Sequence, residues 1–116
     1  MTKPEGERAV KALQKAFLSY LEGNPYLSHL DPIEFNTLRK AVFRTTFDAF
    51  RLGIIGFNYQ AREAMALYQH FFGFYLHHPV IQKLPRDIAE EIVEENFYRV
   101  LQAFRIGAMV RRDAVQ

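Results

Sequence analysis

The sequence of 116 residues contains no cysteine and no tryptophan. Without cysteine the chain forms no disulfide, no thiolate zinc site and no cysteine nucleophile. The first ten residues hold no apolar stretch of the kind that directs secretion, so we expect a cytoplasmic protein. No stretch alternates apolar and polar residues over the length of a half-buried strand. These absences favour an all-α protein of a reducing compartment.

Charged residues are missing between Glu63 and Lys83. Apolar side chains in this stretch would surround nearly the whole circumference of a helix, which must then be covered on most sides. Its apolar part, residues 65–76, is shorter than the ~20 residues that a bilayer requires, and Gly73 and Pro79 interrupt the stretch. We therefore expect no membrane span, and we predict that a second copy of the chain covers this helix in a homodimer.

Four helices are predicted from apolar residues at three- and four-residue spacing. Their expected ranges are Glu5–Glu22, Pro32–Leu52, Asn58–His77 and Pro85–Gly107. Asp31 is the expected N-cap of the second helix, ahead of a proline at the first helical position. Gly23, Gly53 and Gly107 are interpreted as helix ends, and the last six residues as a frayed tail.

A shift of 54 residues aligns the chain with itself without a gap. It gives eleven identities in 49 aligned pairs, where ordinary amino-acid usage gives about three. The identical pairs are Arg8/Arg62, Ala12/Ala66, Leu13/Leu67, Phe17/Phe71, Pro25/Pro79, Leu30/Leu84, Phe43/Phe97, Ala49/Ala103, Phe50/Phe104, Arg51/Arg105 and Gly53/Gly107. The alternative is that two amphipathic hairpins share leucines and phenylalanines through composition alone.

The alignment favours a duplication within one domain of residues 1–116, with repeats at about 5–56 and 59–110. A single helical hairpin cannot bury its apolar face alone, whereas two related hairpins can. We therefore predict a four-helix bundle built from two pseudo-symmetric hairpins.

No set of residues has the spacing of a catalytic or metal site. His70 and His77 are two turns apart, wider than the one-turn spacing with which two imidazoles share an ion, so we expect these histidines and His78 to cap a helix C-terminus or to face solvent. Four glutamates early in the fourth helix should complement its dipole; they are Glu90, Glu91, Glu94 and Glu95. A glycine-rich phosphate loop and a Ser/His/Asp order are absent. We predict a protein that is not an enzyme and that has no cofactor and no metal.

Basic residues form two stripes. Arg8, Lys11 and Lys15 lie along one side of the first helix. The second helix carries Arg39, Lys40, Arg44 and Arg51. Such stripes contact either phosphates or an acidic protein surface. A helix-turn-helix around Gly53 is disfavoured, because the helix after it is too apolar to enter a DNA groove.

Arg51 and Arg105 occupy equivalent positions in the two halves. Each is explained by a place in the last turn of its helix, where a cation opposes the exposed carbonyl groups. Alternatively, the two guanidinium groups bind an acidic group near the approximate two-fold axis that would relate the two hairpins.

We therefore expect a small non-enzymatic adaptor or regulator that binds an acidic protein and acts as a homodimer. The candidate partner-binding residues are Lys40, Arg44, Arg51, Arg105, Phe72, Tyr75 and Leu76. One alternative is a carrier that holds an apolar ligand, such as a lipid chain or a pigment, among its eleven phenylalanines. Another is a nucleic-acid-binding regulator, for which a net charge of +2 is a weak argument.

Overall fold

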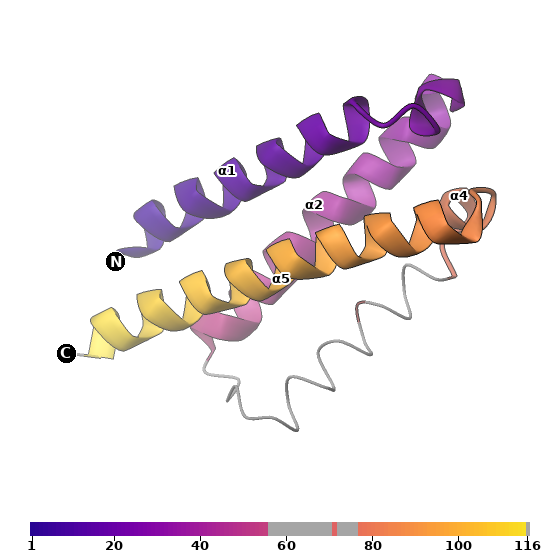
Figure 1. Ribbon diagram of the computed structural model, residues 1–116. Coiled ribbons are helices and arrows are strands. Elements are labelled where there is room, and N and C mark those ends of the chain that lie inside the picture. The colour runs from indigo at the N-terminus through magenta and orange to yellow at the C-terminus, as the bar shows by residue number, and fades with distance from the viewer. Residues whose placement is uncertain (56–70, 72–76, 116) are drawn as a thin grey trace.

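The computed structural model describes residues 1–55, 71 and 77–115, and every regular element in these residues is helical (Figure 1). The described elements are α1 (Lys3–Glu22), the 3-10 turn η1 (Leu27–His29), α2 (Pro32–Ile54), α4 (Pro79–Gln82) and α5 (Arg86–Val115). The prediction of an all-α fold is confirmed. Apart from Phe71 and His77, the predicted helix over residues 58–77 lies outside the described residues, and so do Phe72, Tyr75 and Leu76.

Side-chain caps fix where the first two helices begin. The Thr2 hydroxyl accepts a hydrogen bond from the Glu5 backbone N–H, and the Glu5 carboxylate accepts one from the Thr2 backbone N–H, both at 3.3 Å. This capping box starts α1 two residues earlier than predicted. In α2 the Asp31 carboxylate accepts from the Glu34 backbone N–H at 2.8 Å, with Pro32 at the first helical position as predicted.

Gly107 does not end its helix. α5 continues through it to Val115, so the predicted end near Gly107 and the predicted frayed tail are wrong. Gly53 likewise lies inside α2, which ends one residue later at Ile54. Only Gly23 has the predicted role, as the C-cap of α1.

The two glycines are instead required where α2 and α5 cross. A Cβ atom on Gly53 would lie 2.3 Å from the carbonyl oxygen of Phe104, and one on Gly107 would lie 2.2 Å from that of Phe50. Real side chains do not approach a backbone so closely. A residue without a side chain therefore allows the two backbones to touch, and α5 continues past the crossing.

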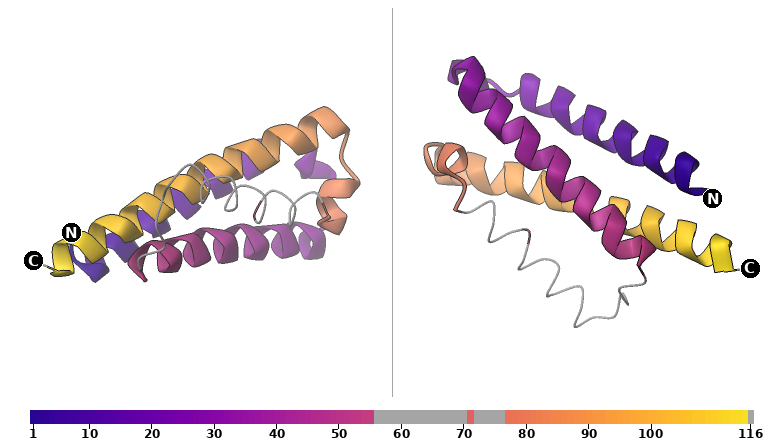
Figure 2. Two further views of the ribbon diagram at one scale, coloured as in Figure 1. Left: turned by 90° about the horizontal axis from the view of Figure 1, so that it is seen from below. Right: turned by 180° about the vertical axis from the view of Figure 1, so that it is seen from behind.

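The described helices pack unevenly. α2 makes its most extensive contact with α5, and both run antiparallel to α1, which packs more closely on α5 than on α2 (Figures 1 and 2). The N-terminus of α1 and the C-terminus of α5 lie at the same end, where the Met1 amino group pairs with the Asp113 carboxylate. As a result, the α1–α2 side of the molecule is packed less tightly than its α2–α5 side.

The described core consists of two apolar clusters with polar residues between them. One cluster contains Phe17, Val42 and Ile92, and the other contains Val10, Ala49 and Val100. On each long helix the residues between the two clusters include a buried polar side chain; these are Gln14 on α1, Thr45 and Thr46 on α2, and Asn96 on α5. Asn96 is 1% exposed, and its side-chain oxygen has no hydrogen-bond partner among the described residues. This polar layer was not predicted.

Residues 24–35 and 78–89 make matching hydrogen bonds at positions 54 apart. The matched pairs are Tyr26 N–Asn24 Oδ1 (2.9 Å) with Val80 N–His78 Nδ1 (3.2 Å), Leu30 N–Leu27 O with Leu84 N–Ile81 O (both 3.1 Å), and Phe35 N–Asp31 O (3.0 Å) with Ala89 N–Pro85 O (2.9 Å). α2 and α5 also begin at equivalent positions, Pro32 and Arg86. Burial along residues 27–55 follows that along 81–109 at all but four pairs of positions.

Candidate functional site

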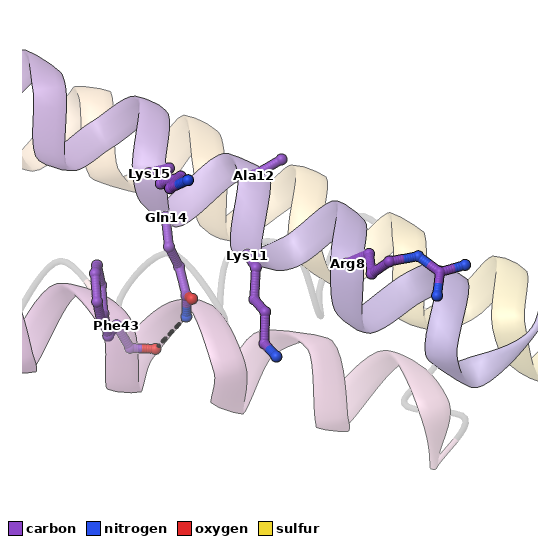
Figure 3. Close-up of a pocket in the computed structure, with 6 residues that line it drawn as sticks. All are labelled: Arg8, Lys11, Ala12, Gln14, Lys15 and Phe43. Carbon is purple, nitrogen blue, oxygen red and sulfur yellow. Dashed lines mark hydrogen bonds between the residues drawn. The ribbon is translucent and has the colours of Figure 1, made fainter.

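The surface between α1 and α2 is hollowed along its length. The middle hollow, of about 470 Å³, is lined by Arg8, Lys11, Ala12, Gln14, Lys15 and Phe43 (Figure 3). A second, of about 390 Å³, is lined by Lys3, Glu7, Phe47, Phe50, Arg51, Ile54 and Ile55. The third, of about 290 Å³, lies at the other end against η1, lined by Leu21, Glu22, Leu27, Ser28, Leu30, Pro32 and Phe35. We call the surface that follows these three hollows the α1–α2 seam.

Gln14 bridges the middle of the seam. Its side-chain amide donates a hydrogen bond to the carbonyl oxygen of Phe43 at 3.0 Å (Figure 3). Lys11 also extends from α1 toward α2 beside this bond. The two helices are therefore joined here by a long polar side chain, whereas α2 and α5 touch through glycine backbones.

Two phenylalanine rings of α2 reach the surface along the seam. Phe43 and Phe47 are half-buried, although their spacing in the sequence predicts core positions. The Arg39 guanidinium lies over the Phe43 ring at 5.4 Å, and that of Arg51 lies over the Phe47 ring at 5.6 Å. Such cation–π contacts hold the guanidinium groups against the rings. Arg39 also donates from Nε and Nη2 to the side-chain oxygen of Asn36, at 3.1 Å and 2.7 Å.

The seam brings the two predicted basic stripes together. Lys11 and Lys15 of the first stripe line the same hollow as Phe43, and Arg51 of the second lines a hollow with Lys3 of α1. All four of these cations are exposed.

Two further predicted residues extend the basic surface along α2. Lys40 and Arg44 are exposed and lie on the same helical face as Phe47 and Arg51, at three- and four-residue spacing. Arg44 is 4.0 Å from the Asp48 carboxylate, which is a weak pair at an exposed position.

Arg51 and Arg105 have different surroundings. Arg51 lies in the last turn of α2 as predicted. Arg105 is exposed on α5, which continues for ten more residues, so its predicted place in a last helical turn is wrong. The carbonyl group of Ile54 at the end of α2 instead accepts a hydrogen bond from the Arg111 guanidinium at 3.4 Å. The symmetric binding of an acidic group by Arg51 and Arg105 stays a prediction.

A second polar cluster joins α1 to α5. The Tyr20 hydroxyl donates to the Glu91 carboxylate at 3.1 Å, and Arg99 pairs with Glu95 at 2.8 Å while lying over the Phe17 ring at 5.0 Å. Burial, followed by the bond to Glu91, raises the pKa of Tyr20 to about 12. A phenol with that pKa stays protonated at neutral pH and cannot act as a general base. The cluster is therefore best explained as a link between helices. In the sequence, the i, i+4 spacing of Glu95 and Arg99 is the pattern from which this ion pair could have been predicted.

The two described histidines of the uncharged stretch also differ. His77 is exposed, which agrees with the prediction that it faces solvent. His78 is buried and is the N-cap of α4, where its Nδ1 accepts from the Val80 backbone N–H at 3.2 Å. The prediction that His78 faces solvent is therefore wrong, and the helix C-terminus that it was predicted to cap lies outside the described residues. Burial lowers the pKa of His78 below its ordinary value, which favours the neutral imidazole that this bond needs.

In residues 1–55, 71 and 77–115 there is no group of three or more side chains able to hold a metal ion. None of the helices described is long and apolar enough to cross a membrane. Comparison with protein-family models, with curated proteins and with solved structures finds no match to this chain.

Proposed function

We propose that this chain is a small non-enzymatic helical protein that binds other proteins, as an adaptor or regulator, through the α1–α2 seam. The observation that carries the proposal is the partly buried pair of phenylalanine rings, Phe43 and Phe47, which line the hollows, lie under guanidinium groups and are flanked by lysines. Aromatic and arginine side chains are enriched where protein interfaces gain most of their binding energy.

Selection of binding peptides tests this proposal. A displayed library of random peptides is selected against the immobilised protein and then screened against two variants with the same change in net charge. Lys11→Glu/Lys15→Glu alters the seam, and Arg86→Glu/Arg112→Glu alters the exposed side of α5. Peptides that lose binding to the first variant but keep it with the second support the proposal. Enrichment of peptides that do not distinguish the variants contradicts it.

We also propose that the two halves are copies of one hairpin and together form a four-helix bundle. The matching hydrogen bonds of residues 24–35 and 78–89 support this proposal. So does the reciprocal contact at the crossing, where Gly53 meets Phe104 while Gly107 meets Phe50. Shared composition alone would not reproduce bonds at the same positions.

The homodimer remains part of the proposal, and its predicted interface lies outside the described residues. Sedimentation at micromolar concentration should show twice the mass of the 13.6 kDa chain, and a species of that single mass would contradict it.

Two measurements separate the proposal from its alternatives. Native mass spectrometry of the purified protein would reveal the bound lipid or pigment of a carrier. Tight binding to a DNA duplex, with the steep salt dependence that phosphate contacts cause, would indicate a nucleic-acid-binding regulator.

A further inference from the structure

We infer that the partner of the α1–α2 seam is an acidic amphipathic α-helix of another protein, and that the first half of the chain alone binds it. This inference rests on the proposed function, because it names the partner of that same surface. It combines the charge of the seam, the spacing of its exposed residues and the difference between the two halves.

The charge of the seam is strongly positive. The two larger of its three hollows are lined by five cations, Lys3, Arg8, Lys11, Lys15 and Arg51, and by a single carboxylate, that of Glu7. The whole chain carries a net charge of only +2, so the positive charge is concentrated here. A partner with the opposite charge is attracted over about a Debye length, ~10 Å at 0.1 M salt.

The apolar part of the seam suits a helix. Lys40, Arg44, Phe47 and Arg51 share one face of α2 at helical spacing, and Phe43 lies one turn before Phe47 toward α1. The three hollows extend from Ile54 at one end of α2 to Pro32 at the other. That length of about 33 Å accommodates about six turns of a second helix. Leucines at i, i+4, i+7 and i+11 of such a helix would meet the phenylalanine rings, and acids beside them would meet the cations.

The second half of the chain lacks the charges that would make a second site. The counterparts of Lys11 and Lys15 are Met65 and Gln69, which are uncharged. The counterpart of Lys40 is Glu94, which is exposed and acidic. An acidic helix therefore has one site on the chain, and we expect one helix bound per chain.

Fluorescence anisotropy with three labelled peptides tests the inference. Each peptide has about 18 residues, a length that spans about five helical turns. The first has leucines at i, i+4, i+7 and i+11 with glutamates on both sides. The second keeps the leucines and replaces every glutamate by lysine, and the third keeps the glutamates and replaces every leucine by serine. The proteins are the wild type, Lys11→Glu/Lys15→Glu and the matched Arg86→Glu/Arg112→Glu variant. All four substituted side chains are exposed, and circular dichroism checks that each variant is folded.

The first peptide should bind the wild type with one site per chain, and the other two should bind at least about tenfold more weakly. The Lys11→Glu/Lys15→Glu variant should bind the first peptide about tenfold more weakly, because each reversal replaces an attraction by a repulsion. The α5 variant should remain within about twofold of the wild type.

Three results would overturn the inference. The first is a lysine peptide that binds as tightly as the glutamate peptide. The second is a glutamate peptide that binds both variants equally. The third is a short DNA duplex that displaces the glutamate peptide from the seam at lower concentration than the unlabelled peptide does. If peptides from the displayed library still depend on Lys11 and Lys15, the seam binds proteins and only the partner class is wrong. Failure of the proposed function is distinct, because then no selected peptide depends on the seam.

Discussion

At the scale of single residues, the closest approach between helices depends on two glycines. Gly53 and Gly107 are buried, and the hypothetical Cβ of each meets a backbone oxygen of the opposite helix, at 2.3 Å and 2.2 Å. A backbone atom cannot rotate away as the end of a side chain can. Any added side chain must therefore push α2 and α5 apart along their main contact.

Substitution of these glycines measures that contact. We expect Gly53→Ala and Gly107→Ala each to lower the free energy of unfolding by about 3 kcal/mol or more, the upper range for overpacking. Gly23→Ala is the control, because its added Cβ would have no neighbour closer than 3.5 Å, and it should change stability by about 0.5 kcal/mol or less. Urea denaturation measures all three. Near-neutral results at both crossing glycines would mean that the helices do not touch there.

Asn96 is the weakest point of the polar layer, because its buried oxygen has no hydrogen-bond partner in the part of the chain that the structure describes. Its counterpart in the first half is Val42, also buried. Asn96→Val removes the unpaired oxygen, so we expect it to stabilise the protein by about 1 kcal/mol. Thr46→Val is the matched control, because it also replaces a residue by the type found at the equivalent position of the other half, here Val100. Because the Thr46 hydroxyl donates to the Val42 carbonyl at 2.6 Å, its loss should give no gain. A destabilised Asn96→Val protein would show that the amide has a structural role.

His78 should make stability depend on pH. Its pKa in the folded protein is lowered by burial, so the folded state binds its proton less readily than the unfolded state does. The stabilisation is complete above the ordinary pKa of about 6.5 and is lost as the pH falls from there through the folded pKa. His78→Asn keeps an acceptor like that of Asn24 but does not titrate.

Thermal unfolding at pH 7.5 and pH 5.5 measures this difference. The wild type should lose more stability than His78→Asn as the pH falls, while the remaining histidines contribute equally to both proteins. Parallel losses in the two proteins would mean that the cap of α4 does not depend on a neutral His78.

At the scale of elements, the starts of helices could be predicted from sequence better than their ends. Asp31 and Pro32 start α2 as predicted because a cap and a fixed φ act locally. The end of α5 was missed because Gly107 is a C-cap signal by itself, and only the opposite helix shows that it is a contact. The seam was missed for a similar reason. Phe43 and Phe47 lie at the edge of the apolar stripe of α2, and their exposure depends on how far α1 lies from α2.

The proposed equivalence of the two hairpins can be tested with one aromatic residue of each. Phe17 is 0% exposed and Phe71 is 3% exposed. Truncation of a core phenylalanine costs about 3–5 kcal/mol, so Phe17→Ala and Phe71→Ala should each lose a similar amount in this range. Chemical denaturation monitored by circular dichroism measures both. A nearly neutral Phe17→Ala beside an unfolded Phe71→Ala would show that the hairpins are not equivalent.

At the scale of the whole molecule, the α2–α5 side is tightly packed and the α1–α2 side is more open. α2 and α5 contact each other through backbone, and α1 packs mainly on α5, so the α1–α2 side keeps hollows lined by rings and cations. Sequence alone gave the two basic stripes, because their spacing is a property of each helix. It could not show that Lys11 and Arg51 belong to one surface, since that depends on packing between helices.

The most direct measurement is nuclear magnetic resonance of the ¹⁵N-labelled protein during titration with the glutamate–leucine peptide. The account predicts that amide signals of Lys11, Lys15, Phe43 and Phe47 shift, together with the side-chain amide of Gln14, which is bonded to the Phe43 carbonyl. Signals around Arg86 at the start of α5 should stay in place. Shifts confined to α5, or no shifts at all, would contradict the claim that the α1–α2 seam is the binding surface.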